Sequence, residues 1–97
     1  MIVENGQVAA LIKPQFEAGR EEVGKHGIIR DPEVHKKVIE NVISYANESG
    51  FSIQGLTYSP ITGGEGNIEF LGYFLFDNKE NAKIDIDGVV DQAHNHF

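Results

Sequence analysis

The hydrophobic pattern begins with a short, continuous apolar run that ends at a lysine and a proline. Residues 8–12 are all apolar, and Lys13 and Pro14 follow them, which is typical of a buried strand over residues 7–13. Residues 15–30 show no helical or strand period and contain three glycines. An irregular segment of this length within a compact domain is uncommon and is often functional, so we interpret it as a long functional loop.

A helix is predicted over residues 31–49. Asp31 can cap its start, Pro32 suits its first position, and Glu33 complements the positive end of the helix dipole. Gly50 stands where a residue in the left-handed conformation commonly ends a helix. Apolar residues recur every three or four positions and form one stripe: Val34, Val38, Ile39, Val42, Ile43 and Ala46.

Two further strands are predicted after this helix. Residues 51–59 alternate between apolar and polar and indicate a strand that bulges at Gly55. Residues 59–67 are rich in turn formers. Residues 68–76 are nearly all apolar or aromatic, which is typical of a strand covered on both faces. We expect these two strands to pair as an antiparallel hairpin.

A last short helix is expected to begin at Asp85 or Asp87 and to end near His96. The predicted order is therefore strand, long loop, helix, antiparallel strand hairpin and short helix. A crossover through the long helix would make the first two strands parallel. This is an α/β fold whose first strand is too apolar for an exposed edge, and such an edge favours pairing with another chain.

Composition narrows the possible functions. The chain has 97 residues, which allow one small domain or part of a larger one, and it has no cysteine, which excludes disulfides and cysteine nucleophiles. A net charge of −7 argues against a free-standing nucleic-acid binder, but six of the eight basic residues lie within residues 13–37. No apolar run approaches the roughly 20 residues that span a bilayer, and we expect a cytoplasmic location with no membrane partner.

Two long motifs resemble a known family. The segments VAALIKPQFEAGREEVGKHGIIRDPEVH, from Val8, and SPITGGEGNIEFL, from Ser59, are similar to the C-terminal part of the hemolysin A (TlyA) family. These are S4-domain proteins with an FtsJ/RrmJ-like methyltransferase domain. The resemblance runs from about Gln7 to Phe76. It implies an RNA 2′-O-methyltransferase that uses S-adenosylmethionine, with ribosomal RNA as the usual substrate.

The resemblance also implies a doubly wound, Rossmann-like sheet, of which residues 1–97 form the C-terminal portion. In such a sheet the last strand runs antiparallel between its neighbours. The S4 domain and the cofactor-binding half would lie in parts of the protein that this chain does not contain, so we expect it to be catalytically incomplete. The alternative is a non-catalytic interaction module that forms a homodimer through its exposed strand edge.

Two residues match the family's catalytic tetrad of lysine, aspartate, lysine and glutamate. By position, Lys13 resembles the third member and Glu69 the fourth. Ligands of α/β sheets bind outside the carboxyl ends of parallel strands, which is where Lys13 falls. Glu69 appears one residue into a buried strand, where a carboxylate needs a partner, and Lys13 is the expected one. The structural alternatives are a lysine that extends to solvent at a strand end and a glutamate in an ion pair or facing outward.

Three bases in the long loop, Arg20, Lys25 and Arg30, are candidate contacts for RNA phosphates. The spacing of the four histidines does not indicate a metal site. His94 and His96 would point in different directions on a helix, and His26 and His35 stand alone in the sequence.

Overall fold

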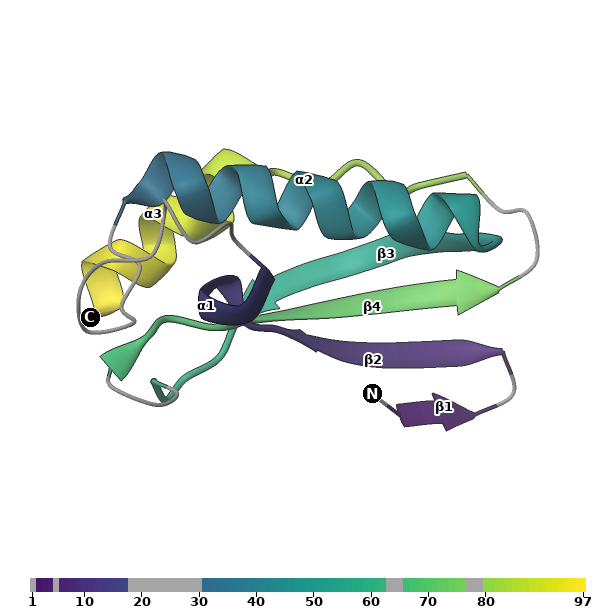
Figure 1. Cartoon of the computed structure of the whole chain (residues 1–97), viewed down its shortest axis with the longest axis horizontal. Helices are drawn as coiled ribbons and strands as arrows, with labels where there is room; N and C mark the ends of the chain where they lie inside the picture. The colour runs from purple at the N-terminus through teal and green to yellow at the C-terminus, as the bar shows by residue number, and fades with distance from the viewer. Residues whose placement is uncertain (1, 5, 18–30, 63–65, 77–79) are drawn as a thin grey trace.

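A four-stranded sheet with helices on one face makes up the described part of the chain (Figure 1). The computed structural model describes residues 2–4, 6–17, 31–62, 66–76 and 80–97. The strand order is β1-β2-β4-β3, and every neighbouring pair is antiparallel. The strands are β1 (Ile2–Glu4), β2 (Gln7–Ile12), β3 (Phe51–Tyr58) and β4 (Phe70–Phe76).

The central strand, β4, runs antiparallel between β2 and β3, which are therefore parallel to each other. This confirms the predicted α/β sheet of two parallel strands with an antiparallel partner. The bulge at Gly55 is also confirmed. Ile53 pairs with Phe74 and Gly55 pairs with Tyr73, so Gln54 is the extra residue in β3.

The first strand, β1, was not predicted from the pattern. It forms a hairpin with β2 around Gly6, whose φ of 78° favours glycine, and the main-chain N–H of Phe76 donates to the carbonyl oxygen of Gly6 at 2.7 Å. β1 pairs with residues 7–9 of β2, so the same chain occupies part of the edge that we expected to be open.

The long helix, α2 (Pro32–Glu48), confirms the sequence prediction. The Asp31 carboxylate accepts a hydrogen bond from the Glu33 main-chain N–H at 2.9 Å, and Pro32 occupies the first helical position. Gly50 follows the helix with a φ of 89°. A second predicted helix, α3 (Ile86–His96), is capped by Asp85, which accepts from the Gly88 N–H at 3.0 Å.

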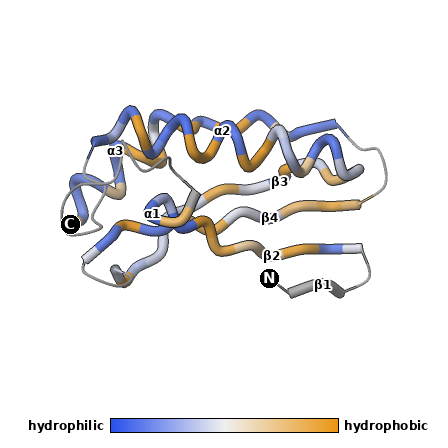
Figure 2. The backbone as a smooth tube through the Cα atoms, in the orientation of Figure 1, coloured by the Kyte–Doolittle hydropathy of each residue, from blue (hydrophilic) through white to orange (hydrophobic). Residues whose placement is uncertain are grey.

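The main core lies between the sheet and these two helices. The apolar stripe of α2 faces β2, β3 and β4, and hydrophobic positions predominate along β2 and β4 (Figure 2). The largest buried cluster joins both helices to the carboxyl end of β2 and the start of β4: Ile12, Val38, Ile39, Phe70, Val90 and Ala93. Lys36 adds a polar link, with its Nζ 3.3 Å from Glu33 Oε1 and 3.5 Å from Asp87 Oδ1.

The electrostatic surroundings of Lys36 favour its charged form. Desolvation lowers its pKa, but the hydrogen bond to Glu33 and the charges of Asp87, Glu33 and Asp91 together raise the pKa above its ordinary value. The ammonium therefore stays charged at neutral pH and links α2 to α3.

The opposite face of the sheet carries no helix in the described part of the chain, and here the prediction that β4 is covered on both faces was wrong. Leu11, Leu71 and Tyr73 point to this face and are 44%, 38% and 39% exposed. Their neighbours in the sequence, Ile12 and Phe70, point to the core, as strand alternation requires.

Residues 14–17 correct the predicted loop, because they form a short helix, α1 (Pro14–Glu17), directly after Lys13. The Phe16 N–H donates to the carbonyl oxygen of Lys13 at 2.9 Å and closes the first turn. Residues 18–30, the rest of the predicted loop, lie outside the described residues. Within the described ranges, no helix is long and apolar enough to cross a membrane.

Candidate functional site

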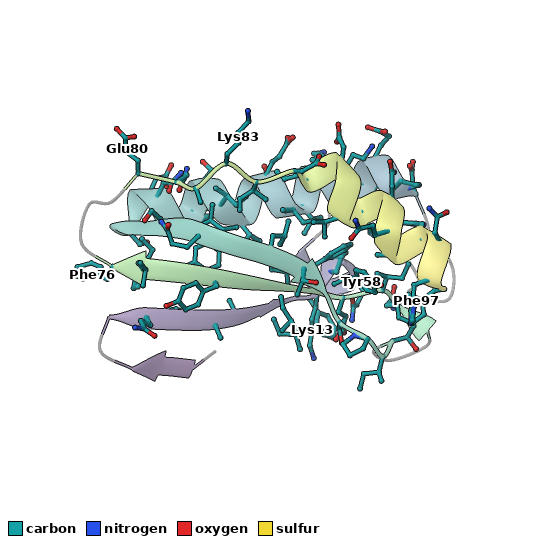
Figure 3. All side chains as sticks on the ribbon, turned by 180° about the vertical axis from the view of Figure 1, so that it is seen from behind. Lys13, Tyr58, Phe76, Glu80, Lys83 and Phe97 are labelled. Carbon is teal, nitrogen blue, oxygen red and sulfur yellow. The ribbon has the colours of Figure 1, made fainter. Side chains whose placement is uncertain are left out.

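The candidate site lies where the parallel strands β2 and β3 end. The last pair of the β2–β4 ladder is Ile12 with Phe70, so Lys13 and Glu69 are the next residues in line on the two neighbouring strands. Figure 3 shows Lys13 and Tyr58 at the same end of the sheet, with Phe76 at the other end. The sequence prediction that Lys13 follows the end of a parallel strand is therefore confirmed.

The Lys13 side chain is half-buried and lies beside an aromatic ring. Its Nζ is 5.5 Å from the centroid of the Phe16 ring, which is a cation–π contact. Phe16 is 74% exposed, which is unusual for so large an apolar side chain. The Lys13 amine therefore lies at the end of β2, over the Phe16 ring.

Glu69 has a different partner from the one that we predicted. It directly precedes β4 rather than lying inside it, and it is only 6% exposed. Its Oε2 accepts a hydrogen bond from Gln15 Nε2 at 2.9 Å, whereas no ion pair joins it to Lys13 in the described residues. The physical reason is Pro14, which begins α1 at this point, so that the chain turns and Gln15 faces the carboxylate.

Gln15 is the residue of this site that the sequence analysis missed. Its Oε1 is buried and has no hydrogen-bond partner among the described residues. The main chain of its partner Glu69 is held by β3, because the Ser59 N–H donates to the Glu69 carbonyl oxygen at 2.8 Å. The only signal for it in the sequence is its closeness to Lys13, two positions earlier. Its contact with Glu69 spans 54 positions, so no local pattern indicates it.

The predicted RNA contacts Arg20, Lys25 and Arg30 all lie in residues 18–30, outside the described residues. The second motif is described only in part. It places Ser59, which is buried, at the end of β3 beside Glu69.

The histidines correct another sequence interpretation, because His35 does not stand alone. His35 is fully buried, and its Nδ1 lies 2.8 Å from Nε2 of His94 on α3. One of these nitrogens must donate and the other accept, so the contact requires at least one neutral imidazole. The His35 ring also packs edge-on against Phe70, at 5.5 Å between centroids. No group of three potential metal ligands occurs among the described residues.

One apolar hollow in the described part of the chain does not fit S-adenosylmethionine. A hollow of about 250 Å³ lies between β2 and the second half of α2, and its lining, which includes Val8, Val42 and Phe51, is almost entirely apolar. It offers no carboxylate for a ribose and no glycine-rich turn. It also lies toward the starts of β2 and β3, whereas Lys13 lies at the end of β2.

The sheet, with an antiparallel strand between two parallel ones, is consistent with the C-terminal part of a Rossmann-like α/β fold. Residues 2–76 match the FtsJ-like methyltransferase family, and the chain belongs to this family. The resemblance to the hemolysin A (TlyA) group is confirmed by curated relatives with these names.

Three relatives illustrate the similarity. The chain is 46% identical over 99 residues to "Putative rRNA methyltransferase YqxC" of Bacillus subtilis, covering 97% of this chain and 35% of the relative. It is 51% identical over 65 residues to "Hemolysin A" of Brachyspira hyodysenteriae, covering 67% of this chain and 27% of the relative. It is 32% identical over 91 residues to "16S/23S rRNA (cytidine-2'-O)-methyltransferase TlyA" of Mycobacterium tuberculosis, covering 93% and 33%.

Solved structures agree with these matches. A "Putative hemolysin from Streptococcus thermophilus" superposes with a TM-score of 0.89 at 48% identity, over 99% of this chain and 35% of that one. A second putative hemolysin, from Lactococcus lactis, gives a TM-score of 0.87 at 57% identity, over 94% and 44%. The chain thus spans about a third of the length of its first curated relatives.

Proposed function

We propose that this chain is the C-terminal portion of an RNA methyltransferase that transfers a methyl group to a ribose 2′-hydroxyl of ribosomal RNA. The names of the relatives YqxC and TlyA support methylation of ribosomal RNA. The observation that carries the proposal is that Lys13 directly follows β2 and the buried Glu69 directly precedes β4, next to the Ile12–Phe70 pair that closes the ladder between these strands.

The chemistry assigns a separate role to each side chain. When a ribose hydroxyl oxygen takes a methyl group, its proton must leave, and a neutral lysine amine can accept it. Lys13 is the proposed base. Glu69 is the proposed charge partner, which balances the lysine once the lysine carries the proton. S-adenosylmethionine would supply the methyl group from a site outside the described residues.

The RNA would approach the end of the sheet at which β2 and β3 finish and Lys13 lies. Arg20, Lys25 and Arg30 are proposed to contact its phosphates, which would position the strand without reading its sequence. The exposed Phe16 ring at the same rim is a suitable surface for a base to stack upon.

A chimera tests this function. Residues 1–97 replace the segment of Bacillus subtilis YqxC that they match, and transfer of labelled methyl groups from S-adenosylmethionine to ribosomal RNA is measured. We expect transfer by the chimera and at least a 100-fold loss after Lys13→Met or Glu69→Gln. Gln54→Met is the control, because Gln54 lies within β3, away from the strand ends that carry Lys13 and Glu69. Equal activity of the Lys13→Met chimera would refute the proposed base.

A second candidate is the non-catalytic module that forms a homodimer through its strand edge. The observation in its favour is that β1 pairs only with residues 7–9, so the outer edge of β2 over residues 10–12 lacks a strand in the described part of the chain. Light scattering behind a sizing column should then show a dimer at micromolar concentration, and a clean monomer would contradict it.

A further inference from the structure

The Gln15 side chain holds the carboxylate of the candidate site. Its amide nitrogen donates to Glu69 Oε2 at 2.9 Å, while its amide oxygen is buried and accepts no hydrogen bond from the part of the chain that the structure describes. A carboxylate can only accept, so the nitrogen end of the amide must face Glu69 and the oxygen end must face away from it. The orientation of the amide is thus set by chemistry.

A buried acceptor without a donor is uncommon in folded proteins and calls for an explanation. The sequence places a suitable donor two positions away. Lys13 carries its amine on a flexible four-carbon stem, and in this structure the amine lies over the Phe16 ring, 5.5 Å from the centroid. A rotation of this stem would exchange the aromatic contact for a hydrogen bond to the Gln15 oxygen.

We infer that Gln15 is a positioning residue that bridges the base and the carboxylate, its N–H groups holding Glu69 and its carbonyl oxygen accepting from the Lys13 amine. This inference rests on the proposed function. A neutral amine has two N–H donors and one lone pair, so donation to Gln15 directs the lone pair toward the ribose hydroxyl.

In this bridge a neutral amide would stand between the two side chains. A direct contact with a carboxylate favours the charged form of a lysine, which cannot accept a proton. A neutral amide between Lys13 and Glu69 weakens that effect but still fixes their separation. Gln15 thus holds the pair together without forming a tight ion pair.

The first test uses nuclear magnetic resonance on the 97-residue chain. We expect the Gln15 side-chain amide protons to exchange with solvent at least 10-fold more slowly than those of Gln92, which is exposed on α3. Glu69→Met should bring the Gln15 rate to within twofold of the Gln92 rate. Equal exchange at Gln15 and Gln92 in the unsubstituted chain would overturn the link to Glu69.

The second test measures methyl transfer in the YqxC chimera. Gln15→Met should lower kcat by about 10- to 100-fold and leave KM for RNA within twofold, because only the geometry of the base changes. Gln15→Glu places a carboxylate next to Lys13, so it should move the rate–pH profile to higher pH, which a purely structural role would not do. Gln54→Met is the matched control and should change kcat by less than twofold.

The outcomes separate this inference from the function on which it rests. Full activity of Gln15→Met, or an unmoved pH profile of Gln15→Glu, would overturn the bridge while leaving the methyltransferase intact. An inactive unsubstituted chimera would instead count against the proposed function, and the exchange measurement would still decide whether Gln15 holds Glu69.

Discussion

Gly72, in the middle of the central strand β4, provides a direct test of the packing. Its position faces the helices, between Ala10 on β2 and Leu56 on β3. A Cβ atom built on Gly72 would lie 2.7 Å from Cε2 and 3.1 Å from Cζ of the Phe74 ring. Phe74 is 3% exposed, so its ring has little room to move away. We therefore expect Gly72→Ala to destabilise the fold.

The magnitude follows from two opposing effects. Forcing an extra methyl group into a packed core costs about 1–3 kcal/mol. Alanine is favoured over glycine within a strand by about 0.5–1 kcal/mol, which offsets part of that cost. The difference is a net loss of about 0–2.5 kcal/mol, centred on about 1 kcal/mol. In a domain of this size each kcal/mol lowers Tm by about 4–8 °C. Far-UV circular dichroism can follow the melt, since the sequence has no tryptophan to serve as a fluorescence probe.

Gly55→Ala is the matched control in the adjacent strand. A Cβ atom at Gly55 would meet only the Tyr73 Cβ, at the ordinary distance of 3.8 Å, so its Tm should stay within about 4 °C of the unsubstituted value. The double substitution Gly72→Ala with Phe74→Leu should lose about 1 kcal/mol less than the two single losses together, because leucine removes the clashing ring atoms. Equal melting of the Gly72→Ala and Gly55→Ala variants would refute this account of the core.

Three further substitutions test the helices and the faces of the sheet. Val38→Asp should leave the chain unfolded, because it buries an unpaired charge at a position that is 2% exposed, whereas Ser44→Asp on the exposed side of α2 should melt normally. Asp85→Ala should cost about 1 kcal/mol, whereas Asp85→Asn keeps the cap of α3 and most of the stability. Leu71→Lys should change Tm by less than about 4 °C, whereas Phe70→Lys, one residue earlier, should prevent folding.

Thermal melts of the paired variants can contradict each of these three predictions. An unchanged melting curve for Val38→Asp would mean that α2 presents a different face. Equal losses for the two Asp85 variants would mean that its carboxylate does not cap α3. A cooperative melt for Phe70→Lys would show that the buried and exposed faces of β4 are assigned wrongly.

The sequence predicts those elements whose signals are local. For α2, Asp31, Pro32 and Gly50 mark the ends, and the apolar stripe marks the buried face, so every needed residue lies within one segment. The bulge at Gly55 was predicted for the same reason, and so was a cap of α3 at Asp85 or Asp87, of which the structure has Asp85. β1 was missed because three residues carry too little pattern, and only the Asn5-Gly6 dipeptide indicates its hairpin.

The contacts of the site depend on residues that are far apart in the chain. No local pattern indicates that Gln15 meets Glu69, or that His35 meets His94 across 59 positions. The exposed face of β4 shows the same limit, because a run of apolar residues does not tell whether both faces are covered within this chain. The resemblance located Lys13 and Glu69, whereas only the structure identified the partner of each.

Pro14 explains why the apolar strand places a lysine at its end. Proline has no N–H, so the ladder between β2 and β4 cannot extend past Lys13, and its fixed φ suits the first position of a helix. The ring is fully buried, which fixes the point at which β2 becomes α1. The turn that follows puts Gln15 against Glu69 and Phe16 beside the Lys13 amine. Pro14 therefore ends the strand directly after the lysine and starts the turn that positions Gln15 and Phe16.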